Sequence, residues 1–344
     1  MGEGESTREP PREGIRRIRA RKQPRVPQPH IAWRAVHGVL LIDKPTGITS
    51  TATLARVRRA LCAQKGGHTG TLDPMATGLL PLCFGEATKF ASDLLDADKS
   101  YEATIRLGVV TDTGDADGRV LEERTVEVTR AAVDRALARF RGPIAQVPPM
   151  HSALKRDGRP LYEYARQGVT VERAARPVTI HRLEVVAFEG TSLSIAVDCS
   201  KGTYIRTLAE EIGEALGCGG HLVALRRVRA GSMHVDGAIA LDAFEARATG
   251  ERDAMLLPID ALIANLPAIE LDAAQARRFT EGQRLAWPDA SYQGRVRVYR
   301  AANTTTRKPG SLLGTALVGF DERLAPVRLV AQSPQRSLES PPPS

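Results

Sequence analysis

The chain has 344 residues, of which 26% are charged and 42% hydrophobic, a composition typical of a globular protein long enough for more than one domain. Its net charge of +8 and its pI near 9.6 favour a polyanionic partner, because a basic surface attracts phosphate groups. No stretch approaches the roughly 18–20 apolar residues of a membrane span and the N-terminus lacks an apolar signal core, so we expect a cytoplasmic protein that does not enter the membrane.

Residues 1–36 are predicted to form a disordered basic arm, because eight arginine or lysine residues between Arg8 and Arg25 alternate with prolines and glycines. His37–Asp43 (HGVLLID) is predicted as the first strand, followed by a turn. Ser50 or Thr51 can cap the next helix, in which apolar residues recur at helical spacing at Leu54, Val57 and Leu61.

The stretch Lys65–Phe90 differs in composition from its surroundings and reads KGGHTGTLDPMATGLLPLCFGEATKF. Its five glycines indicate backbone bends or close approach to a ligand. Asp73 precedes Pro74, which disfavours helical geometry at the aspartate. The sequence therefore predicts a carboxylate on a stiff, glycine-lined loop. Taken alone, an Asp-Pro pair is more often a turn whose aspartate caps a neighbouring amide.

Further along, Tyr101–Leu107 alternates in the manner of a strand that is buried on one face. Residues 111–118 carry three acids, at positions 112, 115 and 117, but the glutamate that would close an EF-hand is missing, so we interpret them as an Asx-rich loop. A helix is predicted over residues 129–141. The segment 147–177 is irregular, and such a segment within a compact domain is usually functional or disordered.

The second half of the chain is predicted to contain further strands, a helix and a separate module. Thr203 can cap a helix that ends at Gly217, and residues 258–267 look like a linker. A short helix and several strand-like runs then suggest a small β-rich module before a low-complexity tail. The predicted strands and half-buried runs are residues 178–188, 193–198, 221–228, 295–300, 312–320 and 327–330.

The four cysteines do not indicate a metal site. They are widely separated, form no CxxC motif and lack the paired spacing of zinc ligands. We expect them to be reduced and structural: Cys62, Cys83, Cys199 and Cys218.

Asp73 is the residue most suited to chemistry, because a positioned and ionised carboxylate can attack a sugar anomeric carbon or act as a base. Most glycoside-cleaving enzymes pair two carboxylates, whereas no second acid lies beside Asp73 in the sequence. This pattern favours a reaction that does not activate water, such as an isomerisation that detaches a base and rejoins it through carbon.

Residues 67–78 resemble the catalytic motif of the bacterial tRNA pseudouridine-55 synthases of the TruB family. The family pattern G-H-T-G-x-L-D-P-x-A-T-G is matched at Gly67, His68, Thr69, Gly70, Leu72, Asp73, Pro74, Ala76, Thr77 and Gly78. The block Lys201–Arg206 matches the family's K-G-T-Y-I-R, and the run HLVALRRVRAG is similar to a further block. The resemblance covers roughly residues 37–331.

The resemblance implies the catalytic roles. Asp73 attacks the ribose, and Arg206, which by itself would pass as a surface helix residue, holds it charged and oriented. Tyr101, which by itself would more often belong to the core, stacks on the target base and accepts the proton released from its carbon.

The resemblance also implies the residues that bind the substrate. Tyr204 and Leu225 would form walls of the uridine pocket, and His68 would contact the RNA and help to keep the flipped nucleotide out of the stack. Phosphate contacts could come from basic side chains that singly are more often solvated charges: Lys44, Lys89, Lys99, Lys155, Arg156 and Arg159.

For the fold, the resemblance implies an α+β protein with a central, mainly antiparallel sheet flanked by helices, plus a small β-rich, PUA-like C-terminal domain. The implied boundaries are a disordered basic arm over 1–36, a catalytic domain over 37–257 with an RNA-gripping insertion at about 147–177, a PUA-like RNA-binding domain over 258–331, and a disordered tail over 332–344. The arm is either a solvated tail or an additional, non-specific RNA contact.

For function, the resemblance implies conversion of uridine to pseudouridine at position 55 in the T-loop of tRNA, after the base has been flipped out of its stack. No metal or organic cofactor is expected. The expected partner is the T-arm of tRNA, bound by a monomer without an obligatory protein partner. Direct attack at the anomeric carbon and a glycal route both stay open.

Two other classes of function are compatible with parts of the sequence. The chain could be a structural RNA-binding factor with an idle pocket, which the intact Asp73, Tyr101 and Arg206 disfavour. The glycine-rich loop could instead cradle nucleotide phosphates as in an NTPase, but the G-K-[ST] ending is missing after Gly70.

Overall fold

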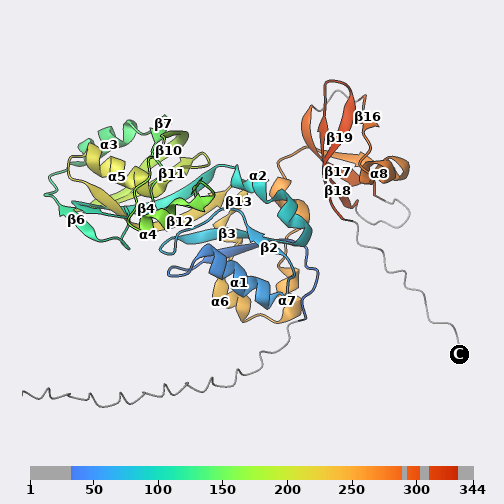
Figure 1. Ribbon diagram of the computed structural model, residues 1–344, viewed down its shortest axis with the longest axis horizontal. Coiled ribbons are helices and arrows are strands. Elements are labelled where there is room, and N and C mark those ends of the chain that lie inside the picture. The colour runs from blue at the N-terminus through green and yellow to red at the C-terminus, as the bar shows by residue number, and fades with distance from the viewer. Residues whose placement is uncertain (1–31, 289–292, 303–309, 332–344) are drawn as a thin grey trace, which may run out of the picture. The chain divides into compact units, whose positions relative to one another are not determined.

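The computed structural model describes residues 32–288, 293–302 and 310–331, which are coloured in Figure 1. The predicted arm, apart from residues 32–36, and the predicted tail lie outside the described residues. Of the helices in the described part of the chain, none has the length and apolar character that a bilayer crossing requires.

The catalytic-motif residues belong to a ten-stranded sheet. Its strands are β1 (Gly38–Lys44), β2 (Gly66–His68), β3 (Thr77–Phe84), β4 (Lys99–Leu107), β7 (Gly142–Gln146), β10 (Arg176–Glu189), β11 (Ser192–Cys199), β12 (Gly220–Ala230), β13 (Met233–His234) and β14 (Ile239–Ala240). Their order is β14-β1-β3-β12-β4-β11-β10-β7, with β2 paired to β3 and β13 to β12. All neighbours are antiparallel except β1 with β14 and β3 with β12, so the predicted mainly antiparallel sheet is confirmed.

The amino-acid pattern explains where these strands lie in the sheet. β3 is apolar almost throughout and nearly every side chain is buried, as expected for a strand covered on both faces. β4 alternates from its third residue onward, so one face contacts the core and the other faces outward. β12 lies between them, and the backbone of β12 therefore joins the strand after the glycine-rich loop to the strand that carries Tyr101.

Helices and short ribbons surround the sheet. Figure 1 shows α1, α6 and α7 grouped beside β1–β3, and α3 and α5 beside β10 and β11. These elements are α1 (Ser50–Ala60), η1 (Gly85–Phe90), α2 (Ala91–Leu95), β5 (Val109–Thr111), β6 (Val120–Glu123), α3 (Arg130–Ala138), α5 (Ile205–Ala215), η2 (Val235–Gly237), α6 (Leu241–Glu245), α7 (Thr249–Ala254) and η3 (Ile259–Ile263). The predicted irregular segment contains the ribbon β8 (Lys155–Arg156) with β9 (Arg159–Pro160), and α4 (Leu161–Arg166).

Two predicted helix caps were wrong by one residue. The N-cap of α1 is Thr49, whose hydroxyl accepts from the amide of Ala52, and the hydroxyl of Ser50 is engaged with the glycine-rich loop instead. The N-cap of α5 is Tyr204, without a side-chain cap, because the Thr203 hydroxyl donates to the carbonyl of Ser200. Position 217 ends α5 as predicted, with its glycine at a φ of 80°.

Three buried clusters occupy the sheet domain. One is built around α5, β10 and β11, a second around α1, β1 and β3, and a third around η1, α2 and η3 with other residues of β1 and β3. Tyr101 and Leu225 are half-buried and pack against the first two clusters. These two side chains therefore lie on the boundary between the cores, where neither core encloses them completely.

The C-terminal module has a sheet and a core of its own. Five strands in the order β15-β17-β18-β19-β16 are accompanied by one helix, and their buried residues form a separate cluster. The elements are β15 (Ala268–Leu271), α8 (Ala273–Thr280), β16 (Leu285–Ala286), β17 (Gly294–Arg300), β18 (Leu312–Val318) and β19 (Arg323–Leu329). The expected linker contains η3, whose Leu262 and Ile263 are buried with residues of β1 and β3, so part of it belongs to the catalytic domain core.

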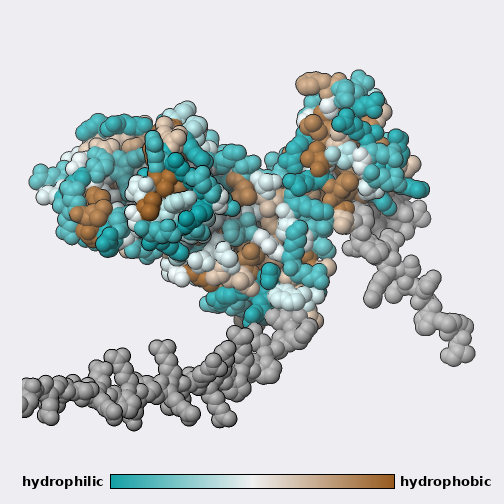
Figure 2. Space-filling view, in the orientation of Figure 1, coloured by the Kyte–Doolittle hydropathy of each residue, from teal (hydrophilic) through white to brown (hydrophobic). Residues whose placement is uncertain are grey.

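The surface is largely hydrophilic, as the composition of the chain predicts. Figure 2 shows a largely hydrophilic face on which the apolar residues are scattered in small groups. Large apolar side chains that are well exposed include Val120, Leu121, Val186 and Phe320. Single exposed apolar residues of this kind are ordinary on protein surfaces.

A substitution at Gly78 of β3 tests how closely β3 and β12 approach each other. Its φ is 96°, and a Cβ there would lie 2.3 Å from the carbonyl oxygen and 2.9 Å from the amide nitrogen of Arg227. We expect Gly78→Ala to lower the free energy of unfolding by about 3 kcal/mol, through backbone strain and overpacking. Denaturant titration measures this loss. Gly67→Ala is the control, since a Cβ there meets nothing within 4 Å, and an equal loss in both variants would contradict the prediction.

Candidate active site

The loop that carries Asp73 is held in place by residues from β1 and from the start of α1. The Ser50 hydroxyl donates to the Leu72 carbonyl at 3.1 Å and accepts from the Leu72 amide at 2.8 Å. The Gly47 amide donates to the Pro74 carbonyl at 2.8 Å. With the backbone bonded on both sides of Asp73 and Leu72 buried, the position of the carboxylate is fixed by the fold.

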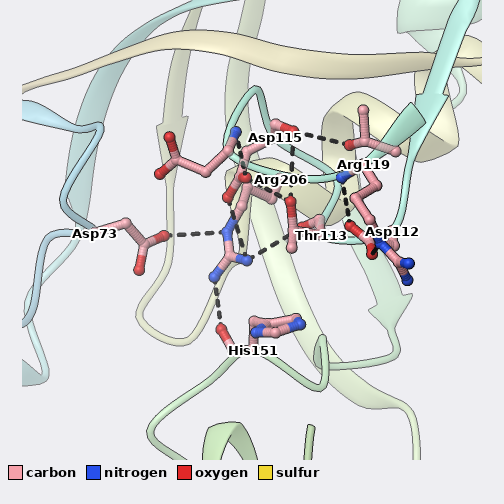
Figure 3. A network of polar contacts seen from close by, with 9 residues as sticks. Asp73, Asp112, Thr113, Asp115, Arg119, His151 and Arg206 are labelled. Carbon is pink, nitrogen blue, oxygen red and sulfur yellow. Dashed lines mark hydrogen bonds and ion pairs between the residues drawn. The ribbon is translucent and has the colours of Figure 1, made fainter. Parts of the chain in front are cut away.

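Arg206, the second residue of α5, joins this loop to two other segments, as Figure 3 shows. Its Nε lies 3.0 Å from Oδ2 of Asp73, and its Nη1 lies 3.5 Å from Oδ2 of Asp115. Two further hydrogen bonds go from Nη1 to the Thr113 carbonyl at 3.2 Å and from Nη2 to the His151 carbonyl at 2.7 Å. The Arg206 side chain is 6% exposed, so these contacts fix the guanidinium in one orientation.

Asp115 is a site residue that the sequence analysis missed. It lies in the loop interpreted as Asx-rich, and its Oδ1 does accept from the Thr113 hydroxyl and the Asp117 amide. The loop is fixed to β12 by bonds of Leu222 with Gly114 and Ala116. Among the three acids of this loop, the sequence contained no signal that distinguished the one whose second oxygen faces Arg206.

The insertion supplies the His151 carbonyl that binds Arg206, and Gln146, which directly precedes the insertion, holds Tyr204 in place. Gln146, at the end of β7, accepts from the Tyr204 amide at 2.8 Å and donates to the Tyr204 carbonyl at 3.1 Å. This buried glutamine fixes Tyr204 at the start of α5, one residue before Ile205 and two before Arg206. Ser152, in the insertion, lines the cavity together with Tyr204. Sequence reasoning did not identify Gln146, because only the fold brings β7 beside α5.

These residues surround a cavity of about 340 Å³, within the range of small-ligand pockets. Of the predicted site residues, the structure brings five into its lining: Asp73, Tyr101, Tyr204, Arg206 and Leu225. Two buried basic side chains also line it, Lys99 and Arg227, of which sequence reasoning had not singled out Arg227.

Burial sets the protonation of the groups in this cavity. It raises the pKa of Asp73, while Arg206, and more weakly Lys44, oppose that rise. Burial also raises the pKa of Tyr101, against the influence of the Arg227 guanidinium. One turn beyond Arg206 on α5, burial raises the pKa of Glu210 to about 7.

The remaining predicted site residues either lie outside the lining of the cavity or have amines that are already hydrogen-bonded to backbone carbonyls. His68 is half-buried in β2 outside the lining of the cavity, and burial and the nearby Arg227 lower its pKa. The Lys44 amine is buried and donates to the carbonyls of Pro45, Ile48 and Pro74, so it is not placed to meet a phosphate. Lys99 is similarly enclosed.

The other basic candidates lie closer to the surface. Lys89 pairs with Glu86 at 2.7 Å. Lys155, Arg156 and Arg159 are exposed on the β8–β9 ribbon of the insertion, where they can reach solvent. Within the described residues, no group of three or more His, Cys, Asp or Glu side chains is arranged to hold a metal ion.

Family models match most of the chain. Residues 58–205 match the TruB family pseudouridylate synthase (N terminal domain), and residues 206–264 match the tRNA pseudouridylate synthase B C-terminal domain. Residues 267–330 match pseudouridine synthase II TruB, C-terminal.

Curated relatives are similar over nearly their full length. A tRNA pseudouridine synthase B of Burkholderia mallei (strain ATCC 23344) is 57% identical over 310 residues, 88% of this chain and 97% of that protein. One of Ralstonia pickettii (strain 12J) is 59% identical over 292 residues, 82% and 91% of the two chains. One of Cupriavidus pinatubonensis is 56% identical over 305 residues, 88% and 96%.

Solved structures share the fold. A Cbf5-Nop10-Gar1 complex contains a chain that matches with a TM-score of 0.66 and 25% identity, over 88% of this chain and 86% of that one. A chain of an H/ACA RNP bound to a substrate RNA containing 2'-deoxyuridine matches with a TM-score of 0.65 at 23% identity, over 86% of each. The matching models and the relatives above 55% identity, together with the Asp73–Arg206 site, lead to one conclusion: the chain belongs to the TruB family of pseudouridine synthases.

Proposed function

We propose that this pseudouridine synthase acts on uridine 55 in the T-loop of tRNA, with Asp73 as the group that attacks the ribose. The observation that carries the proposal is the 3.0 Å pair of Asp73 with a buried Arg206 at the wall of a cavity that Tyr101 and Tyr204 also line. The names of the relatives support tRNA as the substrate, because each is called a tRNA pseudouridine synthase B.

Asp73 meets the two requirements of a nucleophile in this site. Its side chain remains 38% exposed toward the cavity while Arg206 contacts one oxygen, so the other oxygen is available to a sugar carbon. The partners of Arg206 restrain its guanidinium, which therefore orients the carboxylate before substrate binds. Direct attack at C1' and abstraction that leads to a glycal both begin from this placement, and both stay open.

The target base must leave its stack to reach Asp73, because the carboxylate lies in a cavity rather than on a protruding surface. Two tyrosine rings and Leu225 offer flat and apolar walls for an everted uracil. In this proposal Tyr101 stacks on the base and accepts the proton from C5, while Tyr204 and Leu225 close the pocket. His68 acts from outside it, as a contact to the RNA around the flipped nucleotide.

The basic ribbon of the insertion is the part proposed to contact the phosphate backbone. Lys155, Arg156 and Arg159 are exposed there, and His151 at the base of the insertion touches Arg206 through its carbonyl. We propose that the C-terminal β-rich module is PUA-like and contacts RNA. We also propose a cytoplasmic monomer that binds the T-arm without an obligatory protein partner, metal or organic cofactor.

Replacing the nucleophile tests the reaction. Asp73→Asn keeps the size of the side chain but removes its charge and most of its nucleophilicity, so release of tritium from 5-tritiated uridine in tRNA should fall at least about 1000-fold. Binding of tRNA, measured by filter retention, should persist. Asp134→Asn, an exposed helix carboxylate paired with Arg130, is the control and should keep full release. Release by Asp73→Asn at the control rate would exclude the proposed nucleophile.

The choice of nucleotide is tested with the RNA. A tRNA transcript in which uridine 55 is replaced by cytidine should give no tritium release, because the other uridines are not presented to the cavity. The unaltered transcript should release one equivalent and acquire pseudouridine at position 55, as read by chemical sequencing. Undiminished release from the altered transcript would mean that the enzyme selects another position.

The pH dependence follows from the burial of Asp73. Because burial raises the pKa of Asp73, the reactive ionised form is lost as pH falls, at a pH above the ordinary range of an aspartate. We expect the single-turnover rate to decline on the acidic side accordingly. Glu210, with a pKa near 7, titrates nearby, so the profile of Glu210→Gln is the control. An acidic limb that disappears in Glu210→Gln would assign the titration to Glu210 and not to Asp73.

A further inference from the structure

Arg227 is a buried cation that the mechanism above does not use. It is 1% exposed and lies in β12, at the centre of the sheet. No carboxylate of the described residues forms an ion pair with it, whereas its neighbour Arg226 pairs with Asp43 at 2.7 Å. A buried charge without a counter-ion is costly, so its presence points to a requirement other than stability.

The contacts of Arg227 connect the catalytic loop with β3, opposite Tyr101. Its Nε donates to the Leu79 carbonyl at 2.8 Å, and its Nη2 donates to the Gly70 carbonyl at 3.3 Å. Tyr101 lies opposite Arg227 in the pairing of β4 with β12, and both residues line the cavity. Two fixed carbonyls thus hold the guanidinium on the strand next to Tyr101, where its charge opposes the rise that burial causes in the pKa of the phenol.

Among the groups around Tyr101, Arg227 is the one that keeps its positive charge at every working pH. Burial lowers the pKa of Lys44, His68 and Lys99, and the Arg227 guanidinium adds to that effect. Burial raises the pKa of Tyr101, and the guanidinium opposes that rise. Cys199 of β11 also faces Tyr101, but burial raises its pKa to about 11 and leaves it a neutral thiol. Asp73 is the carboxylate that contributes at Tyr101.

We propose that Arg227 is a positioning residue, which fixes the phenolic oxygen of Tyr101 and favours its phenolate form for the final proton abstraction. This inference rests on the proposed function, in which Tyr101 accepts the proton from C5 of the rearranged base. Arginine suits the role because it stays charged at every working pH and holds several donors in one rigid plane.

The step balances without a further reagent. Once C1' has bonded to C5, the C5–H bond breaks and its electron pair forms the C5–C6 double bond. The π electron pair of the C6=N1 double bond, which formed when C5 bonded to C1', moves to N1, and N1 takes a proton from water. The proton from C5 passes to the phenolate oxygen of Tyr101, and the resulting phenol returns it to solvent. Arg227 takes no proton and only stabilises the phenolate through charge and hydrogen bonding.

The experiment measures the deuterium isotope effect on cleavage of the C5–H bond. A pH profile would be less specific, because burial lowers the pKa values of Lys44 and Lys99 to about 8 and their titration would contribute to the same profile. Single-turnover conversion is followed on tRNA that carries uridine or 5-deuterouridine. In Arg227→Gln the rate should fall about 10- to 100-fold, and the deuterated substrate should react more slowly by a larger ratio than in wild type. Arg227→Lys, which keeps a charge, should lie between the two.

Arg229→Gln is the matched control. Arg229 lies two residues along β12, donates to the Ser100 hydroxyl at 2.8 Å and to the Gly231 carbonyl at 3.0 Å, and does not line the cavity. It should keep the wild-type rate and isotope ratio. If Arg227→Gln does not fold, Arg227→Met, which fills the same buried space without a polar group, carries the same expectation.

The outcomes separate this inference from the proposed function. A slower Arg227→Gln without a larger isotope ratio would mean that the residue supports the fold or another step, and an unchanged rate would mean that it has no role in catalysis. Either result overturns the inference while leaving the function intact. A wild-type enzyme that does not convert uridine 55 would instead overturn the proposed function. Tyr101→Phe should lose the isotope-sensitive step, and full activity of that variant would also overturn the inference.

Discussion

The ion pair between Arg206 and Asp73 is the interaction on which the site depends. A guanidinium that is 6% exposed needs partners for its donors, and here they come from three segments: the loop after β2, the loop after β5 and the insertion. The first two of these segments are themselves bonded to α1 or to the sheet. Because three segments fix the guanidinium of Arg206, Arg206 in turn holds the Asp73 carboxylate in one orientation.

The sheet places this pair at the boundary between two hydrophobic cores. Tyr101 and Leu225 pack against both cores, and the cavity opens beside them. β12 makes this possible because it is parallel to β3 and antiparallel to β4. The close approach at Gly78 brings β3, and with it the loop of Asp73, against the strand that carries Leu225 and Arg227.

The charges around the cavity suit a polyanionic substrate and an electron-rich base. Lys99, Arg206 and Arg227 are buried cations that line it, and Lys44 is buried near Asp73. Asp73 and Asp115 pair with Arg206. In the proposed mechanism, buried positive charge lowers the energy of an anion on a detached uracil or on a tyrosine oxygen. The same enclosure makes Lys44 and Lys99 unsuitable as phosphate contacts, since their amines are committed to backbone carbonyls.

The sequence alone determined the family and the strand periodicities, and it singled out Asp73 as the candidate nucleophile, because a motif such as HTGTLDPMATG and the alternation of β4 are local properties. It also indicated Arg206 and Tyr101 through matching blocks. It did not indicate Asp115, Gln146 or Arg227, and it misplaced Lys44 as a surface contact. Those roles depend on which segments meet in three dimensions: an acid in a polar loop, a glutamine at a strand end and an arginine in a basic run have no distinguishing local pattern. Only the tertiary structure decides which of them is buried, and against which partner.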